Sequence, residues 1–269
     1  MFRSSARIPS LFVAFALIGF GPGALSGCGE TAEPEPLPPE EPLPPTPESP
    51  PAPEAPPPSR CRAPEGVDDN PATIAGTVTL INALLAQQEG QALTLPCFLE
   101  SLARPLRLNG TLSRISAQPA DGPANPRLFL LTRDMWLSVV PDGSGSPFLE
   151  LGQLTAADRS IKAEIEFPIH QPLTDASPFE RLPFGNVTTC GLCHANEEPV
   201  LGIPHAMASR ALRPAPNTMV PLEKIRAQHE SCDDATTPAR CEIYTGVFGH
   251  GDVQDEPFPQ EMPTIFRRD

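Results

Sequence analysis

Two cysteines and a histidine stand close together late in the chain, in the stretch Cys190-Gly-Leu-Cys193-His194. With 7 Cys and 5 His in 269 residues, random order would produce about 0.003 copies of this pattern. Thiols at this spacing can pair as a disulfide, act as a redox pair, bind a metal with the imidazole, or bond covalently to a ligand. The choice depends on where the protein is located and on what the other cysteines do.

The first residues indicate an exported protein. A basic start precedes an apolar stretch from Leu11 to Phe20, which is too short to span a bilayer and is typical of a secretory signal. The next stretch, Leu25-Ser26-Gly27-Cys28, resembles the lipobox of bacterial lipoproteins. The resemblance implies a signal peptide over residues 1–27, a lipid anchor on Cys28, and the outer membrane facing the periplasm rather than the inner membrane. An ordinary signal peptide or an N-terminal anchor helix is the alternative.

The segment from Cys28 to Ser59 lacks the composition of a folded domain. Residues 30–59 contain 14 Pro and 7 Glu with no Lys or Arg. So few apolar side chains cannot offset the entropy of ordering the chain. Proline favours an extended polyproline conformation of roughly 3.1 Å per residue, or about 90 Å for this segment. We expect residues 28–59 to form a disordered tether, and a Pro-rich ligand for a partner domain is the alternative.

In an exported chain, the Cys190–His194 stretch resembles the CxxCH haem-attachment motif of c-type cytochromes. In that family the two thiols add across the vinyl groups of haem, and the adjacent histidine is the proximal iron ligand. The resemblance implies one covalent haem c on Cys190 and Cys193, with iron on His194. It covers these five residues and little else of the chain.

The same resemblance suggests a sixth ligand. Small c-type cytochromes supply a distal methionine some tens of residues after the motif, often followed by proline, and Met262 in FPQEMPTIF has that setting. Met262 is therefore the first candidate. An unoccupied sixth position would instead permit ligand binding or sensing. The competing residues are Met207, Met219, His205, His229 and His250.

Three other interpretations of the motif stay open. A thioredoxin-like pair needs a strand-to-helix setting, which the surrounding sequence lacks. A zinc site would need a fourth ligand beside Cys190, Cys193 and His194, such as His205. A plain disulfide between the two cysteines would leave the histidine incidental.

Cysteine parity favours two disulfides if the motif carries haem. An oxidising compartment disfavours free thiols, and seven cysteines minus Cys28 and the motif pair leave four. Cys232 and Cys241 would close a short loop rich in turn-forming residues. Cys61 and Cys97 then pair by elimination.

Residues 60–175 are patterned as a β-rich domain. The cleanest strand, IKAEIEFPIH over 161–170, alternates apolar with polar residues, as in an antiparallel sheet covered on one face. Short strands separated by turns favour an antiparallel β-sandwich or open barrel. We also expect strands near 106–113, 127–133, 135–141 and 146–153, and a helix over 77–88.

The periodicity fades in residues 176–269, where only Val220–Cys232 has a helical pattern. We expect a loop-rich, weakly helical segment that carries CxxCH and binds the haem. Apolar residues that fit the walls of a haem pocket flank the motif, and ordinary core is the alternative for them: Phe179, Leu182, Phe184, Val200, Leu201 and Ile203.

The charge balance argues against a nucleic-acid partner. The chain has a net charge of −14, and the part after the tether carries −9 of it, whereas a nucleic-acid footprint is basic. No Ser-His-Asp spacing, Gly-rich phosphate loop or prominent carboxylate pair favours an enzyme, so an electron carrier is expected rather than a catalyst.

Together these features predict a membrane-tethered, c-type cytochrome-like lipoprotein with one haem. It would transfer single electrons in the periplasm or at the outer membrane, to a redox partner that the sequence does not name. The alternative is a cell-envelope binding or structural lipoprotein without haem, in which Cys190 and Cys193 form a disulfide or metal staple.

Overall fold

The structure, a computed structural model, describes residues 59–265. The expected signal peptide, lipid anchor at Cys28 and nearly all of the tether lie outside the described residues, as do residues 266–269. None of the helices within 59–265 is both long enough and apolar enough to cross a membrane.

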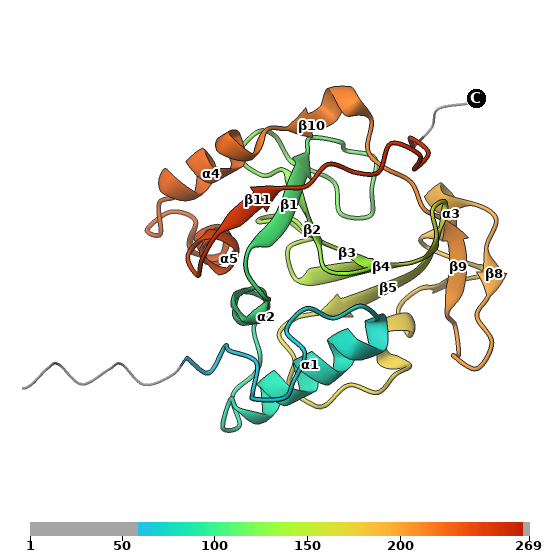
Figure 1. The fold of residues 1–269 in the computed structure, drawn as a ribbon, viewed down its shortest axis with the longest axis horizontal. Helices are drawn as coiled ribbons and strands as arrows, with labels where there is room; N and C mark the ends of the chain where they lie inside the picture. The colour runs from blue at the N-terminus through green and yellow to red at the C-terminus, as the bar shows by residue number, and fades with distance from the viewer. Residues whose placement is uncertain (1–58, 266–269) are drawn as a thin grey trace, which may run out of the picture. The chain divides into compact units, whose positions relative to one another are not determined.

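The described residues are mainly β, as predicted (Figure 1). One mixed nine-stranded sheet has the order β10-β1-β2-β3-β4-β5-β9-β8, and β11 pairs in parallel with β1. The strands are β1 (Leu106–Thr111), β2 (Arg127–Leu131), β3 (Met135–Val139), β4 (Phe148–Ala156), β5 (Arg159–Glu166), β8 (Glu198–Pro199), β9 (Met207–Arg210), β10 (Met219–Val220) and β11 (Val253–Asp255). A separate hairpin joins β6 (Pro183–Phe184) to β7 (Val187–Thr188). The long strands are therefore the ones whose alternating pattern the sequence reveals.

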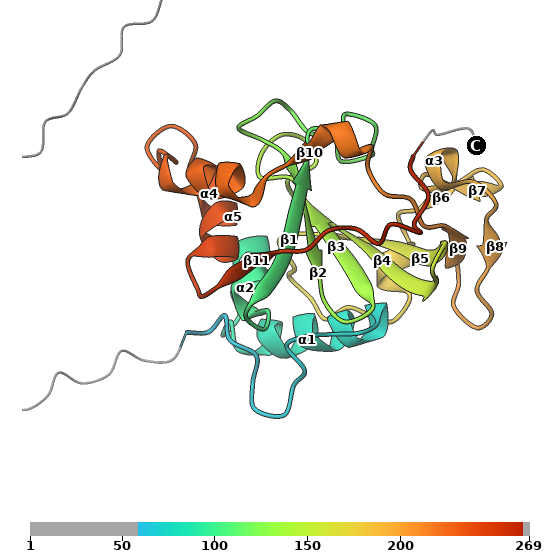
Figure 2. The ribbon, with the colours of Figure 1, turned by 45° about the horizontal axis from the view of Figure 1, so that its top comes forward.

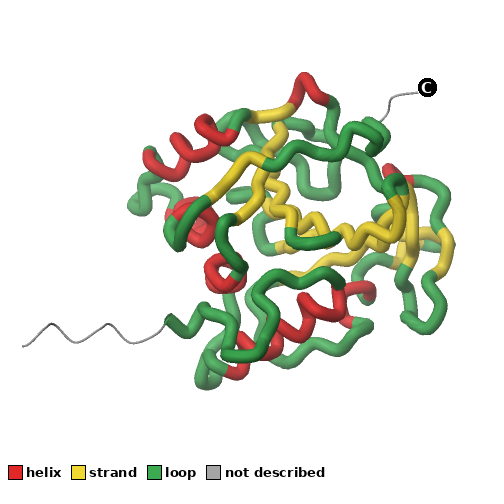
Figure 3. The backbone as a smooth tube through the Cα atoms, viewed as in Figure 1, coloured by secondary structure: helices red, strands yellow, loops and turns green. Residues whose placement is uncertain are grey.

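The prediction of a loop-rich C-terminal segment is not confirmed. Strands β8 to β11 join the same sheet as β1 to β5, so both sides of residue 175 share one sheet. The segment also contains α3 (Gly191–His194), α4 (Leu222–Glu230) and α5 (Pro238–Phe248), besides short 3-10 turns at Ser177–Phe179 and Pro216–Thr218. Most of these strands have only two to four residues, too few to produce a visible alternation in sequence. Figure 3 shows how they alternate with loops along the chain.

One face of the sheet packs against helices to form the main core. Helix α1 (Ile74–Ala86) buries Leu80, Ile81 and Leu84 there, and its N-cap is Thr73, whose hydroxyl accepts a hydrogen bond from the Gly76 amide. Helix α2 (Leu95–Ser101) packs closely on α5, because a Cβ on Gly246 would lie 2.8 Å from the Pro96 carbonyl oxygen. The sheet contributes residues such as Leu108, Leu130, Leu137 and Leu149, all fully buried.

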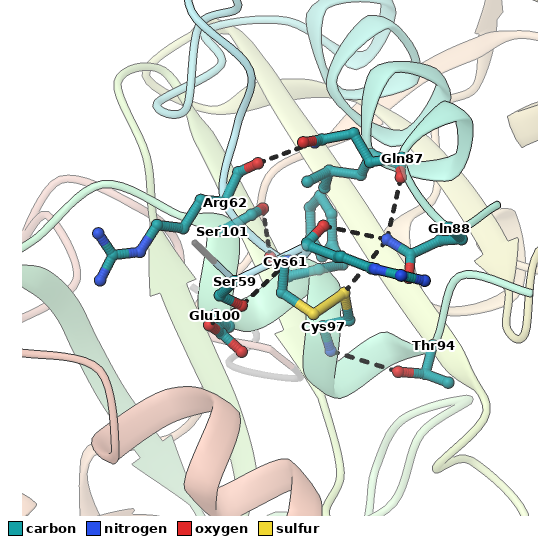
Figure 4. Close-up of a disulfide and its surroundings, with 12 residues drawn as sticks. Ser59, Cys61, Arg62, Gln87, Gln88, Thr94, Cys97, Glu100 and Ser101 are labelled. Atoms are coloured by element: carbon teal, nitrogen blue, oxygen red, sulfur yellow. Dashed lines mark hydrogen bonds between the residues drawn. A yellow bond between two sulfur atoms is a disulfide. The ribbon is translucent and has the colours of Figure 1, made fainter. Parts of the chain in front are cut away.

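Both expected disulfides are present. Cys232 pairs with Cys241 between α4 and α5, and Cys61 pairs with Cys97 of α2. Figure 4 shows how the second bridge fastens the start of the folded part: Gln87 at the end of α1 donates to the Arg62 carbonyl at 2.9 Å, and Gln88 is directed toward the disulfide. The crosslink thus holds the entering chain against two helices of the core.

The two disulfides should differ in their effect on stability. Cys61 and Cys97 are 36 residues apart and Cys232 and Cys241 only 9, and a longer closed loop removes more entropy from the unfolded chain. The double variant Cys61→Ala/Cys97→Ala should lose about 4 kcal/mol of unfolding free energy, and Cys232→Ala/Cys241→Ala about 3 kcal/mol. Denaturant titrations of both variants measure this. A larger loss for the shorter loop would contradict the expectation.

Candidate functional site

The second face of the sheet is polar and partly hollow. Its side chains form rows across the strands, and one row runs from Trp136 on β3 through Gly152 on β4 to Lys162 on β5. The next row places Ser138 beside Glu150. Because Gly152 has no side chain, this part of the face is open between Trp136 and Lys162. Apolar and polar residues alternate in β5 as the sequence predicts. The polar side of the strand, however, forms the floor of a cavity instead of a solvent-exposed surface.

A segment after β11 covers this face. We call residues 256–265 the strap; it leaves β11, crosses in front of β2 and β3 and ends near α3 (Figures 1 and 2). Phe258 stacks on Trp136 with ring centroids 4.3 Å apart. The backbone of Arg213 accepts from Ile265 and donates to Pro263, both at 2.9 Å. The strap is therefore held by aromatic stacking at one end and by main-chain hydrogen bonds at the other.

Between the floor and the strap lies a cavity, called here the sheet-face cavity. Strands β1 to β5, the loop 113–117, the motif loop, residues 211–214 and the strap all line it. Its empty space is about 990 Å³ when the solvent at its open mouth is included. Five strands at about 4.8 Å spacing make the floor roughly 19 Å wide. A broad, flat ligand suits such a space.

The motif residues stand at one wall of this cavity on a single helical turn, α3. The His194 amide donates to the Cys190 carbonyl at 2.9 Å and closes the turn. Behind it, the Glu197 carboxylate accepts from the Thr188 amide at 2.8 Å. A Cβ on Gly191 would lie 2.4 Å from that carboxylate. Because residue 191 is glycine, the Glu197 carboxylate can lie against the turn. The sequence alone did not indicate this contact.

His194 is held in one orientation by β9. Its Nδ1 lies 2.8 Å from the Arg210 carbonyl oxygen, to which the neutral ring donates its N–H. Burial, with a contribution from nearby Lys162, lowers the pKa of His194 to about 3. The imidazole is thus neutral near pH 7, and its Nε2 keeps a lone pair. A ring N–H donated to a carbonyl is the arrangement that orients metal-ligating histidines.

The two cysteines are free thiols, each half-buried. Burial, followed by the nearby Glu150 carboxylate, raises the pKa of Cys190 to about 12, so its sulfur stays protonated. Lys162 lies close enough to counter part of this shift. Desolvation in turn lowers the pKa of Lys162 to about 8. A cationic ammonium and a neutral thiol therefore share this end of the cavity.

The zinc interpretation finds no support in the geometry. Within residues 59–265, no group of three or more His, Cys, Asp and Glu side chains is arranged to hold a metal ion. His205, the suggested fourth ligand, is exposed in the turn between β8 and β9. Covalent attachment of a porphyrin does not require such a cluster, because the thiols bond to carbon and only the imidazole binds iron.

Among the candidate sixth ligands, only Met262 lines the sheet-face cavity within the described residues. Its side chain is 3% exposed and packs with Trp136 and Phe258. The other candidates lie elsewhere: Met207 and Met219 are half-buried outside the lining, His205 is exposed, His229 stacks on Phe248, and His250 faces Glu100. Cys190, Cys193, His194 and Met262 thus share one cavity.

None of the six apolar residues that flank the motif lines this cavity. Phe179 and Leu182 are buried in the main core and Val200 and Ile203 pack against it, as the alternative of ordinary core predicts, whereas Phe184 and Leu201 are 57% and 95% exposed. The apolar lining instead comes from the strands and the strap: Phe129, Trp136, Leu151, Leu154, Phe258 and Ile265. Proximity to the motif in sequence was a poor guide, because the lining residues are brought together by sheet pairing.

Comparisons of the chain with models of known protein families, with curated proteins and with solved structures found no match.

The neutral, buried state of His194 predicts a pH dependence of stability. The folded protein takes up this proton only near pH 3, whereas the unfolded chain takes it up near pH 6.5. The unfolded state therefore binds more protons between these values, and stability falls as the pH falls through that window. Acidification from pH 7 to pH 5 should cost the haem-free protein up to about 2 kcal/mol more than it costs His194→Gln.

Chemical denaturation at several pH values measures this difference. His170→Gln, which changes an exposed histidine, is the matched control and should follow the wild-type curve. Parallel curves for the wild type and His194→Gln would show that this histidine is not buried in its neutral form.

Proposed function

We propose that this protein is a c-type cytochrome-like lipoprotein that carries one covalent haem c and transfers single electrons at the cell envelope. The observation that carries the proposal is the joint lining of one cavity by Cys190, Cys193, His194 and Met262. Three of these residues belong to the motif, but Met262 comes from the strap some 70 residues later in the chain. If the CxxCH pattern had arisen by chance, we would not expect it to line the same cavity as a buried methionine sulfur.

The residues present fit a haem in three respects. The two sulfurs are unpaired thiols rather than a disulfide. The neutral imidazole is oriented through its Nδ1 and offers Nε2. The lining combines aromatic and aliphatic side chains with unpartnered donors, namely Trp136 Nε1 and Arg213 Nε. When bound, a haem supplies a reversible one-electron change at its iron.

The chain's own residues would bind and insulate that group. Cys190 and Cys193 would hold the group through two thioethers, a linkage that adds S–H across a carbon–carbon double bond and needs no oxidant. His194 would hold the iron through Nε2, and Met262 would be the second protein ligand through its thioether sulfur. Phe129, Trp136 and Phe258 exclude water from one side. A membrane anchor at Cys28 and an envelope location belong to the same proposal.

The second candidate is a haem-free envelope binding protein that uses the same cavity. It is favoured by the polar floor, which could orient a different ligand. The two proposals differ in the fate of the thiols, because a staple requires a third disulfide between Cys190 and Cys193. Thiol counting by mass spectrometry after alkylation separates the two.

Expression with the cytochrome c maturation proteins should yield covalent haem. We expect a band that stains for haem peroxidase activity after denaturing electrophoresis and a mass increase of one haem. Cys190→Ala and Cys193→Ala should each abolish the double thioether linkage. Cys232→Ala/Cys241→Ala, which removes two cysteines outside the cavity lining, should retain it. Folded wild-type protein without any attached haem would remove the proposal.

Replacing Met262 should change the reduction potential and the absorption spectrum of the haem iron and leave the fold intact. Met262→Leu nearly conserves volume and apolar character, so the protein should still fold and attach haem. The reduction potential should fall by on the order of 0.1 V, within the ~0.8 V range set by axial ligands, with loss of the sulfur-to-iron absorption band. Met219→Leu, which packs at the same apolar cluster outside the cavity lining, should change neither. Equal spectra and potentials for both variants would exclude Met262 as a ligand.

A further inference from the structure

Lysine is rare in this chain, and one of its two lysines stands in the sheet-face cavity. The sequence contains 17 Arg and 2 Lys. Lys224 is exposed on α4, whereas Lys162 lines the cavity from β5. Arginine keeps its charge in proteins, but a lysine removed from water can become a neutral amine and a nucleophile. The proposed haem chemistry uses no amine and leaves Lys162 without a role.

The Lys162 ammonium has few contacts for a group removed from water. Its one hydrogen bond among the described residues goes to the Ser160 hydroxyl, although an ammonium has three donors. No carboxylate within residues 59–265 lies close enough to form an ion pair with it. Desolvation lowers the pKa of Lys162 to about 8, and the neighbouring cation Arg127 adds to that shift. A desolvated lysine beside a second cation is a setting that activates the amine as a nucleophile.

The floor beside Lys162 is open on the side of Trp136. One row across the strands runs from Trp136 through Gly152 to Lys162, and a Cβ on Gly152 would lie 3.8 Å from the Lys162 Nζ. The amine therefore lies beside an empty position on β4. A flat ring over Gly152 can contact Trp136. The Nε1 of this indole is a buried donor that has no hydrogen-bond partner in the described part of the chain, so an acceptor on the ring would satisfy it.

A carboxylate that can carry protons stands on the same face of the sheet. Glu150 of β4 is diagonal to Lys162, because Gly152 is the residue directly opposite that lysine. Glu150 pairs with Arg127 through Oε2, and its Oε1 is buried without a hydrogen-bond partner among the described residues. A positioned carboxylate oxygen with no donor can take up a proton and return it during a reaction.

We propose that Lys162 is a covalent binding site for an aromatic aldehyde, which it holds as a Schiff base on the floor of the sheet-face cavity. The amine nitrogen bonds to the carbonyl carbon, and one N–H proton moves to the carbonyl oxygen to give a carbinolamine. The second N–H proton then leaves with that hydroxyl group as water while the C=N bond forms. Glu150 carries these protons. Aldehyde and amine thus give imine and water, and no oxidant or reductant is needed.

This site goes beyond the proposed haem and does not rest on it. Both ligands would occupy the same cavity, so the experiment uses the haem-free full chain. We would incubate it near pH 7 with salicylaldehyde, whose ring oxygen is an acceptor, and with cyanoborohydride, which reduces the imine to a stable amine. Peptide mapping by mass spectrometry then locates the adducts.

Lys224 is the internal control, because it is an exposed lysine outside the cavity. Lys162 should be modified at least about tenfold faster than Lys224, since an exposed ammonium at neutral pH is almost fully protonated and unreactive. Trp136 is the only tryptophan in the chain and lines the cavity, so its fluorescence should fall as the adduct at Lys162 forms.

Variants and a second probe test the chemistry. Lys162→Arg keeps the charge but cannot form the imine, so the fluorescence of Trp136 should no longer fall, whereas Lys224→Arg should leave the modification of Lys162 unchanged. Glu150→Gln should slow that modification by about threefold or more. Butanal has the carbonyl group without the ring, and it should modify Lys162 with at least about threefold less preference over Lys224.

The outcomes separate this inference from the proposed function. If salicylaldehyde modifies Lys162 no faster than Lys224, the proposal is overturned, and that result does not depend on any variant folding. An equal preference for Lys162 with butanal overturns the aromatic class of the ligand. Selective modification of Lys162 in a chain that forms no covalent haem in the maturation experiment would keep the aldehyde site and remove the cytochrome function. Covalent haem without selective modification of Lys162 would do the reverse.

Discussion

The hydrogen bond between His194 Nδ1 and the Arg210 carbonyl is the contact on which the site depends. It joins a single helical turn, too short to be stable alone, to a strand of the main sheet. Arg159 on β5 reinforces the same junction by donating to the Asn196 carbonyl at 2.9 Å. Because β9 pairs with β5, the motif is held at the edge of the polar floor. Without this junction the thiols would lie on an unanchored loop.

The two faces of the sheet perform different tasks with the same strands. Alternate residues of β5, such as Ala163 and Ile165, are buried under the helices and supply stability. The residues between them, including Lys162, face the cavity. Sequence alternation therefore identified the strands correctly, since period two is fixed by strand geometry. It could not distinguish a polar face in water from a polar face under a strap, because the strap's position depends on pairing between β11 and β1.

Signals between residues close in the sequence predicted the residues of the candidate site better than they predicted the fold. The parity of the cysteines predicted both disulfides, which the structure contains. The CxxCH spacing singled out Cys190, Cys193 and His194, and the structure places all three at one cavity. Both signals depend on residues close in sequence or on simple counting. The cavity walls were missed because Trp136, Phe258 and their neighbours come from four separate segments. Helix α5 was also missed: it is buried along most of its length and so lacks the amphipathic pattern that marks α1.

The chain order of the cavity's parts has a consequence for assembly. The floor is built from strands that are neighbours in the sequence and can pair through short loops, whereas β11 and the strap contact residues more than a hundred positions earlier. Contacts of such high sequence separation form late, since the closure entropy must be met before they contribute. We therefore expect the floor to form before the strap, so that Phe258 and Met262 pack over it in the last step of folding.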